Sequence, residues 1–286
     1  MKLLWNTNKN TNTFWGNYHF LNSTSWIFSL LSEINYEVIE NINELENNDN
    51  LIIVDSKLNT KKILYEALFK KCSSVYLIHL GDEGGTDELN FIYEKCIHVW
   101  RTFGLPRHFK NNKISSIPIG YKSGSFLDNK KNILNRNYLW SFMGTTHGSS
   151  RHDLIFQHND IKPNFIKYTD IFASKDSLKT EKYYEILQES VFVLVPHGYI
   201  HPETYRLYEG IECGCIPIVE NPHQFYEKFI PDNPFIKINL WKESSTIIKN
   251  LLNDKVAIGE KAEEINIWWL SYKKKLKNKF NRIINV

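Results

Sequence analysis

Cysteine is scarce in this sequence, and its scarcity excludes a disulfide-stabilised fold. The 286 residues hold four cysteines: Cys72, Cys96, Cys213 and Cys215. So few thiols in a chain this long favour a reducing compartment, so we expect a cytoplasmic protein. Cys213 and Cys215 have His197 and His201 nearby, but this spacing matches no common zinc pattern. We therefore expect no metal site.

Long apolar runs and an excess of one charge are also missing. The start, MKLLWNTNKNTNTF, becomes polar after five residues, which is unlike a signal peptide, and no run approaches the ~20 residues of a membrane span. Basic residues number 35 and acidic residues 32, a net charge of +3. This balance does not suggest a nucleic-acid-binding protein. The 42% hydrophobic content is ample for a packed core.

Strand and helix patterns alternate along the chain, which predicts an α/β fold. Apolar runs such as NLIIVDS and SVYLIH alternate with helical patterns such as TKKILYEALFKKC, with Thr60 expected to open that helix. The segment KSGSFLDNKKNILNRN has few apolar residues and is interpreted as a linker. We therefore predict two Rossmann-like domains facing across a cleft, residues 1–125 and 136–258, followed by a C-terminal helix over residues 259–286.

The segment PHGYIHPETYRLYEGIECGCIPIVE, residues 196–220, predicts a loop, a helix and a strand. The apolar run Glu189–Val195 before it is typical of a buried strand. Helical spacing from Thr204 to Cys213 ends at Gly214, and Ile216–Val219 begins the next strand. Parallel sheets bind ligands beyond the carboxyl ends of their strands, so the loop of residues 197–203 is a candidate ligand site.

Arg206 and Glu209 are three residues apart, so they share one face of the predicted helix. The helix N-terminus and the guanidinium of Arg206 both favour phosphate. Glu209 would accept hydrogen bonds from a ribose diol. This pattern suits a nucleoside diphosphate. The alternative is an Arg–Glu surface pair, which would contribute little to stability.

The same stretch resembles the signature of exostosin-type glycosyltransferases: Pro-x-Gly after a strand, Thr/Ser-x-Arg, an acidic residue, and Gly-Cys-Ile-Pro-Val. SFMGTTHGSSR resembles another motif of that family, and YLIHLGDEGG, VWRTF and IPIGYKSG are most similar to its ribitol xylosyltransferase branch. The resemblance implies a GT-B fold and inverting, metal-independent transfer from a nucleotide sugar such as UDP-xylose, with no cofactor. The implied acceptor is a glycan, a polyol phosphate or a lipid-linked molecule. The implied donor-binding residues are Gly144, Arg151, His197, Gly198, Thr204, Arg206 and Glu209.

Inverting transfer also needs a base for the acceptor hydroxyl. Asp82 and Glu83 follow a buried-looking strand of the first domain, so either carboxylate is a candidate. The alternative is a solvated turn that caps the next helix. Asp55, which ends LIIVD, and His147, in a glycine-containing loop, are further candidates.

The C-terminal segment carries Trp268 and Trp269, followed by a lysine-rich stretch. One interpretation is a helix that lies on a membrane surface near a lipid-linked acceptor. The other, which we favour, is a helix that packs its aromatic side chains against both domains. Two other functions stay open at this point: a non-catalytic nucleotide-sugar or glycan-binding relative, and a fucosyltransferase-like enzyme.

Overall fold

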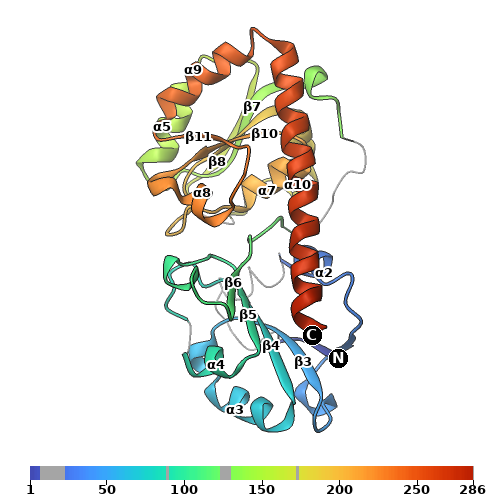
Figure 1. The fold of residues 1–286 in the computed structure, drawn as a ribbon. Helices are drawn as coiled ribbons and strands as arrows, with labels where there is room; N and C mark the ends of the chain where they lie inside the picture. Colours follow the sequence, from blue (N-terminus) through green and yellow to red (C-terminus); the bar gives the residue numbers. More distant parts are fainter. Residues whose placement is uncertain (7–22, 88–89, 123–129, 172–173, 286) are drawn as a thin grey trace. The chain divides into compact units, whose positions relative to one another are not determined.

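The computed structural model describes residues 1–6, 23–87, 90–122, 130–171 and 174–285. The chain divides into two compact units (Figure 1). Unit 1 comprises Met1–Ile119 and Lys275–Val286, and unit 2 comprises Gly120–Lys274. Residues 123–129 of the expected linker lie outside the described residues.

Unit 1 contains a six-stranded parallel sheet with the strand order β2-β1-β3-β4-β5-β6. Its strands are β1 (Lys2–Trp5), β2 (Glu37–Ile39), β3 (Asn50–Asp55), β4 (Ser74–His79), β5 (His98–Arg101) and β6 (Ile114–Ser116). Its α-helices are α2 (Thr24–Leu30), α3 (Lys62–Lys71) and α4 (Asn90–Lys95), and its 3-10 helices are η1 (Ile42–Glu44), η2 (Leu58–Thr60) and η3 (Pro106–His108).

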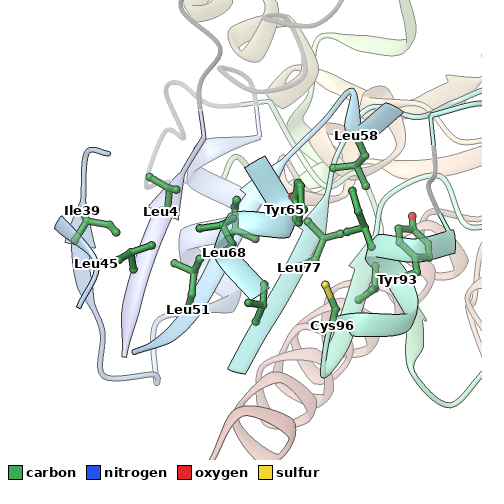
Figure 2. Close-up of a cluster of buried hydrophobic side chains, with 14 residues drawn as sticks. Leu4, Ile39, Leu45, Leu51, Leu58, Tyr65, Leu68, Leu77, Tyr93 and Cys96 are labelled. Carbon is green, nitrogen blue, oxygen red and sulfur yellow. The ribbon is translucent and has the colours of Figure 1, made fainter. Parts of the chain in front are cut away.

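The core of unit 1 forms because its central strands are apolar on both faces. Residues 51–54 of β3 have no exposed surface, as expected for a parallel strand that is covered on both sides. The amphipathic helix α3 buries Tyr65 and Leu68 against the sheet. Figure 2 shows these two side chains within a cluster that includes Leu51 and Leu77.

Unit 2 contains a five-stranded parallel sheet with the strand order β11-β10-β9-β7-β8. Its strands are β7 (Tyr138–Thr145), β8 (Asn164–Thr169), β9 (Ser190–Val195), β10 (Ile216–Glu220) and β11 (Ile236–Ile238). Its helices include α5 (Ser149–His158), α6 (Thr180–Gln188), α7 (Tyr205–Glu212), α8 (Phe225–Phe229) and α9 (Trp241–Leu251), with η4 (Ile133–Asn135) and η5 (Pro222–Gln224) as 3-10 turns.

The long helix α10 (Lys255–Ile284) contributes to both units, residues 255–274 to unit 2 and residues 275–284 to unit 1. In unit 2, Trp269 is buried against Tyr208 with 5.6 Å between ring centroids, and its Nε1 donates to Glu212 at 2.8 Å. In unit 1, Phe280 stacks on Trp100 at 4.2 Å. These aromatic side chains are therefore engaged within the protein. Among the described residues, no helix is both long and apolar enough to span a membrane.

Two local features differ from the sequence-based expectation. Helix α3 begins at Lys62, and the Thr60 hydroxyl donates to the carbonyl of Lys57, so it does not cap the helix. Helix α5 was not expected, because its first residues, SSRHD, are polar. The helix nevertheless buries the side chains of Leu154 and His158. The His158 ring lies 2.7 Å from the Ser244 hydroxyl of α9.

Candidate functional site

Two strand–loop–helix units meet at the carboxyl edge of the unit 2 sheet. Strands β7 and β9 are parallel neighbours, so their carboxyl ends lie at the same edge. Helix α5 follows β7 and helix α7 follows β9, so both helices begin near this edge. The edge therefore has the amide groups of two helix N-termini, a local environment that favours an anion.

Each of these helices carries an arginine in its first turn, Arg151 in α5 and Arg206 in α7. The described first turns of both helices hold no Asp or Glu. A cation at a helix N-terminus is unfavourable because the helix dipole is already positive there. The two arginines therefore add to a positive potential that a bound anion would neutralise.

Arg151 connects the ends of the two neighbouring strands. Its Nη1 donates to the backbone oxygen of Thr145 at 2.8 Å and to the Thr145 hydroxyl at 3.1 Å, and its Nη2 donates to the His197 carbonyl at 3.1 Å. The guanidinium thus holds the end of β7 against the loop that follows β9. Arg151 is buried, so these contacts fix its position.

Arg206 lies against the end of β7. Its Nη2 donates to the Met143 carbonyl at 2.6 Å, and its guanidinium carbon lies 4.7 Å from the centre of the Phe142 ring. Gly144 makes this position accessible, because a Cβ at residue 144 would collide with Arg206 Nη2. The predicted residues Gly144 and Arg206 are therefore in direct contact.

Thr204 and Arg206 each hold a buried polar atom that is left without a partner. Thr204 is the N-cap residue of α7, yet its hydroxyl makes no capping hydrogen bond. Among the residues that the structure describes, neither Thr204 Oγ1 nor Arg206 Nε has a hydrogen-bond partner. Leaving such a group buried and unpaired costs about 1–3 kcal/mol each. The two atoms are thus the clearest sign of a ligand at this edge.

Glu209, one turn after Arg206, is 4% exposed and accepts a hydrogen bond from the Tyr183 hydroxyl at 2.8 Å. Burial raises the pKa of the Glu209 carboxyl, and the Tyr183 hydrogen bond and the Arg206 charge offset only part of that effect. Burial and the nearby Glu209 charge likewise raise the pKa of Tyr183. Glu209 is therefore not the exposed surface partner of the alternative interpretation.

His197 and Gly198 form the start of the loop after β9. The His197 amide donates to Glu220 Oε2 at 2.9 Å, and its ring Nδ1 donates to the Gly198 carbonyl at 2.9 Å. The Ser150 hydroxyl also donates to Glu220 Oε2, at 2.6 Å. Glu220 is a site residue that the sequence analysis missed. The sequence offered one signal for it, because Glu220 is a polar residue directly after the apolar run of β10.

The candidate bases of unit 1 occupy different environments. Asp82 is buried, and its Oδ2 accepts from Arg101 Nη2 at 3.0 Å, while its Oδ1 accepts from the amides of Thr86 and Asp87 at 2.9 and 3.1 Å. Both oxygens are therefore used within the protein, which fits the alternative interpretation of a turn cap. Glu83 is half-buried beside it.

Asp55 and His147 are also held by neighbours. Asp55 has no exposed surface, and its carboxylate accepts from Lys61, Ser56, Tyr65 and Asn6. It is a structural group at the end of β3. In unit 2, the His147 ring lies 2.8 Å from the Thr145 hydroxyl and 5.5 Å from the exposed Tyr199 ring.

Within the described ranges, no cluster of three or more His, Cys, Asp or Glu side chains is arranged to hold a metal ion. Cys213 and Cys215 are buried, and Arg136 donates to the Cys213 carbonyl at 2.7 Å and to the Cys215 sulfur at 3.5 Å. Burial raises the pKa of Cys215 above that of a free thiol. Both cysteines are thus part of the packing between α7 and β10.

Curated relatives are similar to the chain over about half of its length. The chain is 25% identical over 168 residues to ribitol-5-phosphate xylosyltransferase 1 of Danio rerio, and 26% identical over 174 residues to the protein of that name from Homo sapiens. Each match covers 52% of this chain and 38% of the relative, so the chain spans less than two fifths of the length of these proteins.

Three solved glycosyltransferases share the fold. T4 phage BGT in complex with its UDP-glucose substrate is 13% identical with a TM-score of 0.53, and the likeness covers 100% of both chains. An alpha1,3-fucosyltransferase is 14% identical with a TM-score of 0.52, over 100% of this chain and 90% of that one. TarM is 10% identical with a TM-score of 0.56, over 86% of this chain and 57% of that one. At these identities the likeness shows the fold alone.

The two parallel-sheet α/β units and these neighbours identify the fold class as GT-B, as the sequence predicted. The family model described as the RXYLT1 C-terminal domain matches residues 125–286, more than half of the chain, and confirms the resemblance to the ribitol xylosyltransferase branch. The chain therefore belongs to the family of the RXYLT1 C-terminal domain.

Proposed function

We propose that this protein is a glycosyltransferase that takes its sugar from a UDP-linked donor, and that unit 2 binds the diphosphate. One observation carries this proposal: two buried polar atoms that have no partner in the described part of the chain, Thr204 Oγ1 and Arg206 Nε, lie where two helices begin, each with an arginine in its first turn. Phosphate oxygens accept from both donors and neutralise the positive charge. Both atoms are buried in the free protein, so a phosphate reaches them only after neighbouring groups move.

The same groups would stabilise the leaving diphosphate during transfer. Negative charge develops on the diphosphate as the bond to the sugar breaks, and fixed cations and amide dipoles stabilise that charge. Hydrogen bonds to the backbone hold the guanidinium groups of Arg151 and Arg206 at this edge of the sheet. We propose that these groups do the work of a metal ion, and that transfer is inverting and independent of metal and cofactor.

Glu209 is proposed to bind the ribose. Its carboxylate is oriented by Tyr183 and lies one turn from Arg206, so a nucleoside diphosphate that meets Arg206 brings its ribose hydroxyls towards Glu209. The names of the curated relatives support xylose as the transferred sugar and a ribitol phosphate as the acceptor class. A cytoplasmic location remains a prediction.

The test compares two arginines at opposite edges of the unit 2 sheet, the buried Arg206 and the half-buried Arg136. Arg206 lies at the carboxyl edge, whereas Arg136 donates to the carbonyl of Ser190, the first residue of β9, at 2.7 Å. Arg206→Ala should weaken UDP binding by about 1.5–3 kcal/mol, the range for a hydrogen bond to a charged group. Arg136→Ala should lower the melting temperature but leave the affinity of the folded protein for UDP unchanged.

Isothermal titration of UDP into both variants and the wild type separates the outcomes. Equal UDP affinity in Arg206→Ala and wild type would remove Arg206 from the binding site. Equal losses in both arginine variants would mean that the effect reports damage to the fold. If wild type binds UDP but neither transfers nor hydrolyses any UDP-sugar, the protein is a binding relative and not an enzyme.

A further inference from the structure

The carboxyl edge of the unit 1 sheet holds a line of polar side chains that the proposed function has not used. Asp55, His79 and Arg101 occupy matching register positions at the ends of the adjacent strands β3, β4 and β5. All three are almost fully buried. Ionisable groups in such positions need partners, because burying a charge or a polar group alone is costly.

The partners of His79 form a chain of hydrogen bonds that ends at a carboxylate nearer the surface. The His79 ring contacts Asp87 Oδ2 through Nε2 at 3.1 Å and the Tyr93 hydroxyl through Nδ1 at 2.7 Å. An ionised carboxylate can only accept, so Nε2 carries the proton and donates to Asp87. In the neutral ring, Nδ1 then accepts from the Tyr93 hydroxyl, which in turn accepts from Arg101 Nη1 at 3.3 Å.

Asp87 differs from the other two aspartates at this edge. The carboxylates of Asp55 and Asp82 are nearly or fully covered and accept hydrogen bonds at both oxygens from buried or backbone donors. The side chain of Asp87 is 14% exposed, its Oδ1 accepts a longer bond from the Asn59 amide at 3.3 Å, and the Leu58 amide also donates to the carboxylate. Asp87 is thus oriented by a buried histidine and still has oxygen lone pairs that an incoming group can reach.

We propose that Asp87 is the general base of the glycosyl transfer and that His79 and Tyr93 are positioning residues for it. This inference rests on the proposed function. In the step, the acceptor oxygen forms a bond to the anomeric carbon of the donor sugar, and the bond from that carbon to the diphosphate breaks. The diphosphate leaves with the electron pair, and the acceptor's hydroxyl proton passes to a carboxylate oxygen of Asp87. The predicted pair Asp82 and Glu83 then gives way to a residue a few positions later in the same loop.

A carboxylate that acts as a general base must be ionised at neutral pH, and the surroundings of Asp87 favour its ionised form. Burial raises the pKa of Asp87, but hydrogen bonds from His79 and from the backbone amides of Asn59 and Leu58 oppose that effect, and the pKa lies below its usual range. The nearby charged groups are Asp82, whose Oδ1 accepts from the Asp87 amide, and Arg101, which pairs with Asp82. Asp87 is therefore ionised at neutral pH.

The experiment measures UDP release from a panel of UDP-xylose, UDP-glucose and UDP-N-acetylglucosamine, with ribitol 5-phosphate or water as acceptor. Asp87→Asn should lower kcat by about 10²–10⁴-fold, the usual contribution of a general base. Its UDP affinity should equal that of wild type, because the diphosphate site is in unit 2. Glu66→Gln, which alters a carboxylate of the same unit that is 43% exposed, serves as the control and should keep full activity.

Two histidine variants test the positioning role. A glutamine at residue 79 can still donate to Asp87, so His79→Gln should retain more activity than His79→Leu. His79→Leu removes the hydrogen bond that lowers the pKa of Asp87, so the acidic limb of its kcat/KM profile should move to higher pH, whereas His79→Gln keeps a donor to Asp87 and should move the limb less. A purely structural role would lower the melting temperature without moving that limb.

The outcomes separate this inference from the proposed function. If Asp87→Asn turns over within about threefold of wild type, which is far below the effect of losing a base, Asp87 is not the base even though the protein is a glycosyltransferase. If Asp82→Asn loses turnover and Asp87→Asn does not, the base is Asp82. If wild type binds no UDP, or releases none from any donor in the panel, both the proposed function and this inference are overturned.

Discussion

Replacing Thr204 by valine should make the protein more stable and its UDP binding weaker. Valine has nearly the shape of threonine, and the backbone of residue 204 is extended (φ −136°, ψ 150°), which suits a β-branched side chain. The substitution removes only the hydroxyl, which has no partner among the described residues. In the free protein, the substitution removes the free-energy cost of an unpaired buried hydroxyl. In the UDP complex, it removes a hydrogen-bond donor to the phosphate.

The magnitudes follow from that difference. An unpaired buried polar group costs about 1–3 kcal/mol, so Thr204→Val should raise the free energy of unfolding by about 1 kcal/mol. For a domain of this size, 1 kcal/mol corresponds to a rise in Tm of about 2–4 °C. A hydrogen bond to a charged phosphate contributes about 1.5–3 kcal/mol. UDP should therefore bind the variant about 10- to 150-fold more weakly.

Differential scanning fluorimetry of the free protein and isothermal titration of UDP measure the two effects. Thr246→Val is the matched control, because Thr246 is exposed and its hydroxyl donates weakly to the Lys242 carbonyl of α9. It should leave UDP affinity unchanged. If Thr204→Val instead lowers Tm, the hydroxyl caps α7 in solution, since losing an N-cap costs about 0.5–2 kcal/mol. That result, with unchanged UDP affinity, would refute the reasoning.

Three further predictions concern packing, metal and pH. Gly144→Ala should displace the Arg206 guanidinium and weaken UDP binding in a titration, whereas Gly259→Ala, whose Cβ meets no atom within 4 Å, should not. UDP release from the donor panel should survive excess EDTA, and loss of activity that Mn²⁺ restores would contradict the proposed role of the arginines. Burial, with the charges of Lys279 and Lys113, lowers the pKa of His98 from 6.5 to about 4. As the pH falls from 6.5 to 4, His98 takes up a proton in the unfolded chain but not in the folded protein, so the free energy of unfolding should fall. His98→Gln should flatten this part of a plot of unfolding free energy against pH.

The sequence predicted the two sheets well because buried parallel strands leave a strong signal. Runs such as residues 51–54 and 191–195 are apolar at every position, and both runs are buried at every position. The GT-B fold and the family resemblance are confirmed by the comparisons. The chain divides between Ile119 and Gly120, and the end of α10 belongs to unit 1, a long-range association that no local pattern encodes.

The features that the sequence could not reveal depend on contacts between distant residues. The pairing of Asp82 with Arg101 follows from the register of β4 and β5, which no local pattern encodes. Tyr183 and Glu209 are likewise brought together only when α6 and α7 are both in place. Sequence position suggested Asp82 as a base, whereas hydrogen bonding shows that its oxygens are already used.

The central claim is that unit 2 holds a diphosphate between two helix N-termini and two arginines. Its most direct test is titration of the wild-type protein with UDP, UMP and uridine in metal-free buffer. The account predicts that UDP binds at one site, that affinity falls from UDP to UMP to uridine, and that UDP at 100 times its Kd stabilises the protein by about 2.7 kcal/mol. Equal affinity for all three ligands, or no binding of UDP, would contradict it.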